Sequence, residues 1–242
     1  MGHIAELRRR LFIVVLVLGT LAVGLYFVSD QIYALLVGPA KNVIGTQGSF
    51  TFDVLEGMTN RFRLAIWAAV VVGSPVLIYH ALSFFVPALK PKERRWFLWT
   101  FLAAVMLFIG GVAFCYLLIL EPSAQWLVEQ NGQTFELMLR ASSMMQFSMW
   151  FMVGFGVAFE VPIVVFYLVY FDVVPYKQLR KNWRTVWVVI IIVAAMITPD
   201  WSPVSMGALA GAMIGLFEGS MALARVVLRK KIKAQKLELE DD

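Results

Sequence analysis

Six long apolar runs constrain this chain more than any other feature of its sequence. A helix needs about 20 apolar residues to cross the roughly 30 Å hydrocarbon core of a bilayer. The runs are Leu11–Ser29, Leu64–Phe85, Phe97–Leu120, Met144–Phe171, Trp183–Thr198 and Pro203–Ala224. Hydrophobic residues make up 60% of the 242 residues, against about 45–50% in soluble domains, so one soluble core cannot bury them. The sequence therefore predicts an all-α membrane protein with six transmembrane helices.

Two of these runs depart from the ordinary span length. Trp183–Thr198 has 16 residues, which as a helix reaches only about 24 Å, so it must thin the bilayer locally or be sheltered by its neighbours. Met144–Phe171 has 28 residues, and Pro162 within it offers a place to bend. The short link "TPDWSP" between the last two runs predicts an antiparallel hairpin.

The distribution of Lys and Arg predicts the orientation in the membrane. With the N-terminus inside, the cytoplasmic segments hold 17 of the 21 basic residues and the outer segments hold 4. Positive charge concentrates on the cytoplasmic side of membrane proteins, so both termini are expected in the cytoplasm. The net charge of +5 then reflects topology and contact with anionic lipid headgroups rather than nucleic-acid binding.

The segments outside the runs are expected to belong to the same single membrane domain, 1–242. The first run follows three arginines, but we expect it to be retained rather than cleaved as a signal peptide. Residues 121–143 read as an external cap of two short amphipathic helices hinged at Asn131–Gly132. Residues 225–242 read as a charged cytoplasmic tail.

The sequence lacks the patterns that mark common catalytic sites. It has no glycine-rich phosphate loop, no HExxH and no Gly-x-Ser-x-Gly motif, and its two histidines, His3 and His80, are far apart. One cysteine, Cys115, allows neither an internal disulfide nor a cysteine-based metal site, and is expected to pack as a small apolar residue. We therefore expect no enzyme activity, no cofactor and no metal.

Glu160 is the most unusual residue of the fourth run, because no other charge occurs between Arg140 and Asp172. A carboxylate at membrane depth costs about 2.5–3.5 kcal/mol on insertion scales, so such residues face protein or a water-filled cavity. Glu218 in the last run is the other carboxylate at depth, either a hydrogen-bonding neighbour of Glu160 or a second residue lining the same cavity. A secondary transporter or proton-coupled channel that uses both residues as a proton path is one interpretation, although no internal repeat typical of transporters is visible.

Three ordered motifs carry a resemblance to a known family. They are "HIAELRRRL" from His3, "SPVLIYHALSFFVPALKPKERR" from Ser74 and "FEVP" from Phe159, with weaker matches in "ITPD" from Ile197 and "LFE" from Leu216. On a six-span chain with both ends inside, this pattern resembles the TatC family, the membrane-embedded signal-peptide receptor of the twin-arginine, Sec-independent translocase. The chain departs from the family pattern at His80, usually a glutamine, at Ala212, usually a proline, and in lacking a proline before Glu56.

The resemblance implies a fold, partners and site residues. The fold would be a glove-like concave bundle with short fifth and sixth spans, and it would lie in the cytoplasmic (inner) membrane. The partners would be twin-arginine signal peptides of folded cargo, single-span subunits of the TatA and TatB type, the lipid bilayer and, within the complex, further copies of the chain. Residues that match the family's signal-peptide contacts are Glu6, Arg8, Phe84, Pro87, Leu89, Glu93 and Arg94. Glu160, Pro162 and Glu218 would form an intramembrane polar contact for partner helices, and Pro199 and Asp200 an external hairpin.

The two candidate carboxylates also have plainer interpretations. An arginine pair is best held by carboxylates, because a planar guanidinium makes two parallel hydrogen bonds to one carboxylate and lysine cannot. Glu6 could instead pair with Arg9 or Arg10 along its own helix, and Glu93 could neutralise Arg94 or Arg95. The residues alone favour these local pairs, and the resemblance favours the receptor role.

Overall fold

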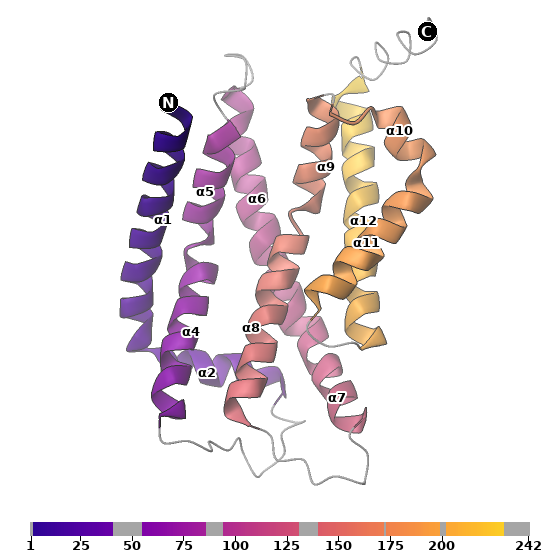
Figure 1. The fold of residues 1–242 in the computed structure, drawn as a ribbon. Coiled ribbons are helices and arrows are strands. Elements are labelled where there is room, and N and C mark those ends of the chain that lie inside the picture. The colour runs from indigo at the N-terminus through magenta and orange to yellow at the C-terminus, as the bar shows by residue number, and fades with distance from the viewer. Residues whose placement is uncertain are drawn as a thin grey trace, which may run out of the picture.

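The computed structural model describes residues 2–40, 55–85, 94–130, 140–171, 173–198 and 202–229, which are almost entirely helical (Figure 1). By length and composition, four helical stretches can each cross a membrane: Ala5–Tyr26, Phe97–Gln130, Ala141–Tyr170 and Pro203–Val227. A bent helix pair adds a fifth candidate, and a shorter apolar helix covers Trp183–Ile197. All six apolar runs are therefore helical, and the predicted all-α membrane fold is confirmed.

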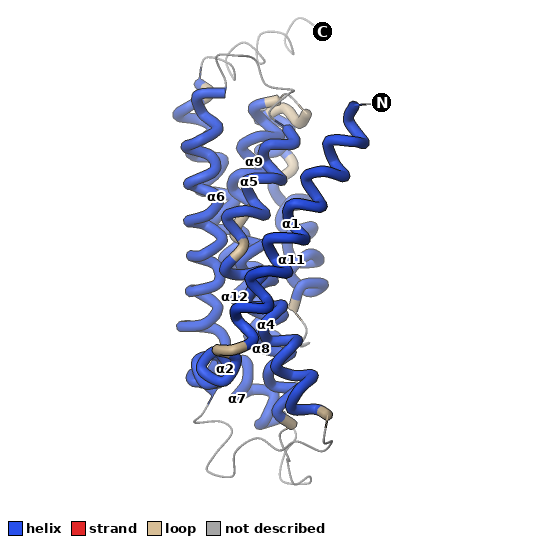
Figure 2. Tube along the Cα trace, turned by 90° about the vertical axis from the view of Figure 1, so that its left-hand side faces the viewer, coloured by secondary structure: helices blue, strands red, loops and turns tan. Residues whose placement is uncertain are grey.

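The first run lies in α1 (Gly2–Tyr26), which starts at the N-terminal side of the run and includes the arginine-rich segment. A short helix, α2 (Ser29–Val37), follows and crosses beneath the bundle (Figure 1). It continues into the single turn η1 (Gly38–Ala40). In Figure 2, α1 crosses the view obliquely, and its N-terminal part lies apart from the other helices. No residue in the most apolar stretch of α1 is buried.

The second run is broken, which the sequence analysis did not predict. It forms α4 (Glu56–Val72) and α5 (Ser74–Phe85), bent by 54° at Gly73. A Cβ atom at Gly73 would lie 2.6 Å from the carbonyl oxygen of Ala69 and 2.7 Å from Cδ2 of Leu18 on α1. A side chain at this position would therefore collide with the carbonyl oxygen of Ala69 and with Leu18 of α1, so only glycine fits at the bend.

The third run continues further than expected. α6 (Arg94–Phe114) passes through a π-helical stretch, η3 (Cys115–Ile119), into α7 (Leu120–Gln130). The first helix predicted for the external cap is thus an extension of the third span rather than a separate element. The predicted hinge at Asn131–Gly132 lies outside the described residues, and residues 141–143 belong to the next helix instead of the cap.

The fourth run bends where its proline predicts. It comprises α8 (Ala141–Ala158) and α9 (Val161–Tyr170), separated by Phe159 and Glu160, with Pro162 in the first turn of α9. Proline is tolerated in a first helical turn because its missing N–H has no partner there in any case. The bend is thereby placed directly at the intramembrane glutamate.

The last two runs form a hairpin of unequal helices. After the short α10 (Tyr176–Lys181), α11 (Trp183–Ile197) has 15 residues, which corresponds to about 22 Å and confirms the short fifth span. α12 (Pro203–Val227) has 25 residues, or about 37 Å. The expectation of a short sixth span is therefore wrong: α12 extends beyond Ala224 into the segment that we assigned to the tail, and residues 230–242 lie outside the described part of the chain.

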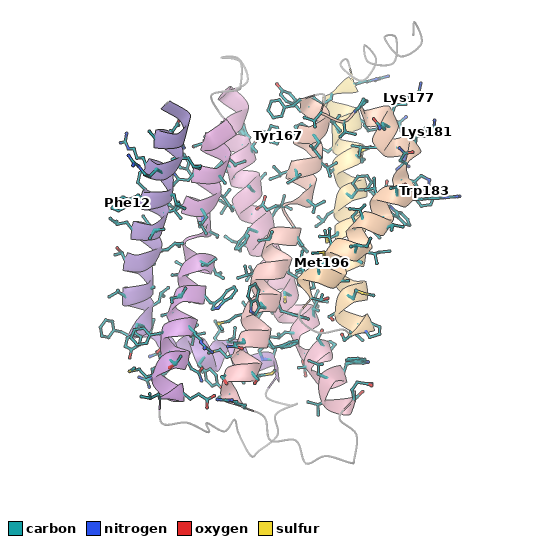
Figure 3. The ribbon with its side chains drawn as sticks, viewed as in Figure 1. Phe12, Tyr167, Lys177, Lys181, Trp183 and Met196 are labelled. Atoms are coloured by element: carbon teal, nitrogen blue, oxygen red, sulfur yellow. The ribbon has the colours of Figure 1, made fainter. Side chains whose placement is uncertain are left out.

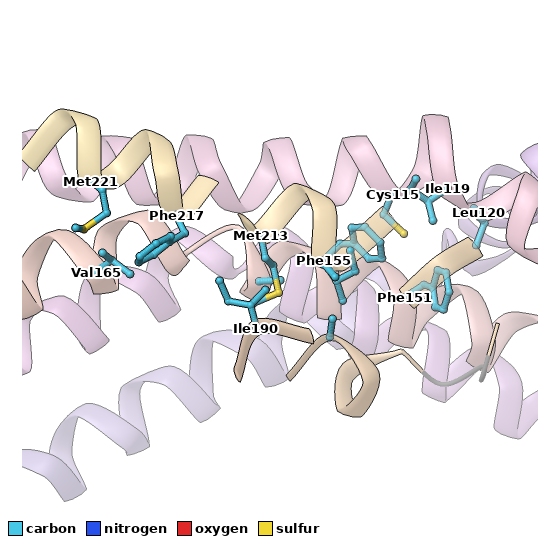
Figure 4. Close-up of a cluster of buried hydrophobic side chains, with 14 residues drawn as sticks. Cys115, Ile119, Leu120, Phe151, Phe155, Val165, Ile190, Met213, Phe217 and Met221 are labelled. Carbon is cyan, nitrogen blue, oxygen red and sulfur yellow. The ribbon is translucent and has the colours of Figure 1, made fainter. Parts of the chain in front are cut away.

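The main core joins the third, fourth, fifth and sixth spans. The rings of Phe151 and Phe155 of α8 lie 5.8 Å apart between centroids and are tilted by 38°. Both belong to the same buried cluster as Met213 and Phe217 of α12 (Figure 4). Cys115 lies fully buried in this cluster, as expected of a small apolar packing residue. The core thus fixes the position of the bent fourth span relative to the sixth.

Gly111 allows α6 to pack directly against the backbone of α8. A Cβ atom there would lie 2.6 Å from the carbonyl oxygen of Phe155 and 2.8 Å from Cγ of Phe159, whereas a Cβ atom at the adjacent Gly110 would meet nothing within 4 Å. We expect Gly111→Ala to lower the free energy of unfolding by about 1–3 kcal/mol, because backbone cannot move aside as a flexible side chain can.

Gly110→Ala is the matched control for this substitution. It should raise the free energy of unfolding by up to about 1 kcal/mol through helix propensity alone. Thermal unfolding of the two variants in the same detergent measures the difference. Equal stabilities would show that α6 and α8 are not packed this closely.

Candidate functional site

Most of the described positive charge gathers at one end of the bundle, here called the basic end. The start of α1, the end of α5, the start of α6, α10 and the end of α12 all lie there (Figure 1). Nine basic residues with described side chains belong to segments at or near this end: Arg8, Arg9, Arg10, Lys177, Arg180, Lys181, Arg184, Arg225 and Arg229. Three belong to the opposite end: Arg61, Arg63 and Arg140. The helices thus bring together the segments that the sequence analysis assigned to the cytoplasm.

Glu6 lies at the basic end and already binds a guanidinium. Its Oε1 accepts hydrogen bonds from Nη2 of Arg10 at 2.5 Å and from Nε of Arg10 at 3.1 Å. The side chain of Glu6 is 38% exposed and that of Arg10 is 23% exposed. Of the two local partners considered from the sequence, the structure pairs Glu6 with Arg10, four residues further along α1. Such a pair along one helix contributes a few tenths of a kcal/mol, so it is readily exchanged.

The remaining predicted contacts of the signal-peptide site are only partly described. Arg8 is exposed on α1. Phe84 lies in the last turn of α5 and Arg94 is the first residue of α6, which places the α5–α6 connection at the same end as Glu6 (Figure 1). Five predicted residues lie outside the described part of the chain: Pro87, Leu89, Glu93, Pro199 and Asp200.

Glu160 occupies the break between α8 and α9. Its backbone carbonyl accepts from the N–H groups of Ile163 and Val164 at 3.0 and 3.1 Å, which starts the hydrogen-bond ladder of α9. The side chain is partly buried, and its Oε1 is buried without a hydrogen-bond partner among the described residues. A buried carboxylate oxygen with no donor is costly, so this atom marks a place where a polar group from outside the chain would be stabilising.

The bend next to Glu160 is held by the sixth span. Ser220 of α12 donates from Oγ to the carbonyl oxygen of Pro162 at 2.7 Å. Ser220 is buried, and this hydrogen bond joins two helices whose positions are 58 residues apart in sequence. The contact fixes the first turn of α9, and therefore Glu160, relative to α12.

Glu218 has a different partner from the one considered from the sequence. Its Oε2 accepts from Nη1 of Arg180 on α10 at 2.6 Å. Arg180 and Glu218 are 57% and 36% exposed at their side chains, so the pair lies at an accessible surface near the basic end. Of the described contacts of Glu218, none joins it to Glu160, and the two carboxylates do not form one hydrogen-bonded pair.

Two ion pairs at the opposite end were not found by sequence reasoning. Arg140, directly before α8, donates from Nε to Oε1 of Glu56 at the start of α4 at 2.8 Å, and the Glu56 side chain is only 5% exposed. Arg61 of α4 donates to Asp30 of α2 at 2.9 Å. The first pair joins residues 84 positions apart, and only a three-dimensional arrangement reveals it. Among the described residues, no group of three metal-ligating side chains is close enough to hold an ion.

Comparison with known proteins places these features in a family. The model of the family described as Sec-independent protein translocase protein (TatC) matches residues 2–211. The Sec-independent protein translocase protein TatC of Deinococcus radiodurans is 33% identical over 228 residues, which cover 93% of this chain and 84% of that protein. The protein of the same name from Carboxydothermus hydrogenoformans is 25% identical over 235 residues, covering 97% and 96%.

A solved structure agrees with the sequence comparisons. The crystal structure of the twin arginine translocase receptor TatC in DDM aligns with a TM-score of 0.77 at 25% identity, covering 92% of this chain and 99% of that one. Because the family model and the fold agree along most of its length, this chain belongs to the TatC family and is a multi-pass membrane component of the Sec-independent, twin-arginine protein translocase, not an enzyme.

Proposed function

We propose that the chain is the receptor of its translocase, and that it binds the twin-arginine signal peptides of folded cargo at the basic end. The observation that carries this proposal is Glu6, a partly exposed carboxylate that holds a guanidinium at the basic end, where α5 ends and α6 begins (Figure 1). That connection contains Glu93, the other carboxylate that matches the family's signal-peptide contacts. The similar crystal structure is that of a protein named a twin arginine translocase receptor, which supports the same role here.

The chemistry favours arginine over lysine at such a site. A guanidinium presents several N–H donors in a rigid plane and pairs with a carboxylate through two hydrogen bonds, whereas an ammonium acts as a point charge. Two arginines of one peptide would each need one carboxylate, and Glu6 and Glu93 supply two. The peptide would displace Arg10 from Glu6, which costs little because that pair joins neighbouring turns of one helix and is partly exposed.

Binding of a twin-arginine peptide and its twin-lysine counterpart to the purified full-length chain tests this proposal. We expect the lysine peptide to bind at least about tenfold more weakly, since losing a charge-assisted hydrogen bond costs about 1.5–3 kcal/mol. Isothermal titration in detergent or nanodiscs gives both affinities. Equal affinities would leave the net charge, and not the arginine geometry, as the basis of binding.

The second part of the proposed function is assembly with single-span subunits of the TatA and TatB type. Its support is the buried, unpartnered Oε1 of Glu160 at the break of the fourth span. A polar group on a partner helix would satisfy this oxygen, and interhelical hydrogen bonds of this kind contribute about 0.6–2 kcal/mol in membranes. Folded cargo would thus be recognised at the basic end, while partner helices assemble within the bilayer.

We also propose that the basic end faces the cytoplasm and that the chain lies in the cytoplasmic membrane. Reporters fused after Asp242 and inserted at Lys90 are expected to report a cytoplasmic location, and a reporter at Asn131 an external one, because basic segments are retained inside. Activity of a compartment-specific reporter enzyme gives the location of each fusion. If the Lys90 and Asn131 fusions gave the same location, the proposed topology would be wrong.

A further inference from the structure

An apolar groove separates the third and fourth spans in the half of the bundle nearest the basic end. Below the break at Phe159 and Glu160, α8 packs closely on α6, but above it α9 diverges from α6 (Figure 1). The space between them has a volume of about 310 Å³. Its described lining comes from α5, α6, α9 and the turn after α9: Leu82, Phe97, Thr100, Ile163, Val164, Tyr167, Leu168, Phe171 and Val173.

The lining of the groove has almost no hydrogen-bonding capacity to offer. Its two hydroxyl groups, on Thr100 and Tyr167, hydrogen-bond to each other at 2.5 Å across the space between α6 and α9. Figure 3 shows Tyr167 in this gap, directed from α9 toward α6. A non-helical peptide segment in such a place would leave its backbone N–H and C=O groups without partners, which is strongly unfavourable in an apolar environment. A saturated hydrocarbon chain carries no such groups.

The size of the groove fits a hydrocarbon chain. An apolar cavity of about 150 Å³ takes up one benzene ring, so the 310 Å³ found here corresponds to about a dozen carbon atoms. The groove runs along α9 from Ile163, one turn after Glu160, to Val173 near the basic end. An acyl chain entering from the membrane surface on this side would lie along it.

The mouth of the groove favours a negative headgroup. α6 begins at Arg94, so Phe97, which lines the groove, lies in the first turn of this helix. The start of a 21-residue helix carries partial positive charge that attracts phosphate, and basic segments at a cytoplasmic surface attract anionic lipid. An apolar lining and the positive end of a helix dipole at its mouth are two features that suit an anionic phospholipid.

We propose that this groove is a binding site for one acyl chain of an anionic phospholipid from the leaflet at the basic end. The lipid fills the space that the bend of the fourth span opens between α6 and α9, and so supports the bent conformation. The proposal requires only that the chain is a membrane protein, and it stands whether or not the basic end binds twin-arginine peptides.

Photo-crosslinking in vesicles of phosphatidylethanolamine and phosphatidylglycerol tests the site. The full-length protein is reconstituted with a trace of phosphatidylglycerol carrying a diazirine in its acyl chain, irradiated and digested, and labelled residues are identified by mass spectrometry. Val164→Trp fills the groove from α9, and Leu82→Trp fills it from α5. Val157→Trp is the matched control, because Val157 and Val164 are 55% and 54% exposed and only Val164 lines the groove.

Labelling is expected to concentrate on groove residues of α6 and α9 in the wild type and in Val157→Trp, and to be lost in both groove-filling variants. A probe with the same chain on phosphatidylcholine should label the groove less. Uniform labelling of all lipid-facing surfaces would overturn the proposal, as would equal groove labelling by the two headgroups. Displacement of the lipid probe by the apolar segment of an added signal peptide would also overturn it, because the groove would then be a peptide site.

Discussion

Glu6→Ala and Glu93→Ala are each expected to weaken binding of a twin-arginine signal peptide by roughly 10- to 150-fold. The estimate follows from the loss of a charge-assisted hydrogen-bonded pair, which costs about 1.5–3 kcal/mol at a partly exposed site. Glu6 is shown in contact with a guanidinium, with both Nε and Nη2 of Arg10 directed at Oε1. An arginine of the peptide would use the same acceptor. Titration of a fluorescent peptide into the purified variants measures the change.

Three further variants separate this mechanism from a general effect of charge. Glu129→Ala removes an exposed carboxylate from α7, far from the basic end, and should leave the affinity unchanged. Glu6→Gln should weaken binding nearly as much as alanine, because an amide offers one acceptor in place of two. Arg10→Gln should tighten binding slightly by removing the internal competitor. Unchanged affinity in both alanine variants would show that Glu6 and Glu93 form only local ion pairs and do not bind the peptide.

Export of folded cargo is expected to be lost in Glu160→Ala while the protein still accumulates in the membrane. Removing the carboxylate saves the insertion cost of about 2.5–3.5 kcal/mol, so insertion of the chain should not suffer. Assembly, however, would lose an interhelical hydrogen bond of about 0.6–2 kcal/mol, and a marginal equilibrium between separate helices is sensitive to that amount. Crosslinking of single-span partners to α9, together with cargo export, measures both effects.

The glutamine variant distinguishes a polar contact from a proton path. An amide still hydrogen-bonds, so Glu160→Gln should retain part of the partner crosslinking and part of the export. A proton carrier must titrate, and glutamine would then abolish activity as fully as alanine does. Failure of Glu160→Ala to accumulate in the membrane would show that Glu160 has a structural role. Full export by this variant would show that Glu160 is not needed as a contact for partner helices.

The sequence predicted the helical spans because their apolar runs are long, and it predicted the bend of the fourth span because Pro162 removes a backbone donor. It did not predict the bend of the second span, although Gly73 precedes a serine and a proline there. The run remains apolar across that point, so hydropathy gives no signal. Gly73 and Pro75 lie at the bend, where Pro75 lacks a backbone donor. The close approach of Leu18 from α1 leaves no room for a side chain at Gly73, and this contact between separate helices cannot be read from local sequence.

The candidate site was predictable in its residues but not in their partners. Glu6 and Arg10 share one helix, so their pairing was among the alternatives that helical spacing offers. Arg180 and Glu218 are 38 residues apart, and Ser220 reaches the carbonyl of Pro162 from another helix. These contacts depend on how α10 and α12 lie against the fourth span. Charge and spacing indicate which side chains are unusual, and packing decides what each one touches.

The π-helical turn at Cys115–Ile119 makes the rotational setting of α7 depend on a single residue. A π-turn accommodates one residue more than an α-helical turn, and each residue of an α-helix advances the side chains by about 100°. Deleting one residue from this turn would therefore leave the axis of the third span almost unchanged while rotating everything beyond it. Ser123 and Ala124, which α7 now buries, would swing toward the surface, and charged neighbours such as Glu121 would turn with them. One inserted residue in η3 therefore sets which face of α7 packs against the bundle. Insertion or deletion at this point would change that face while leaving α6 in place.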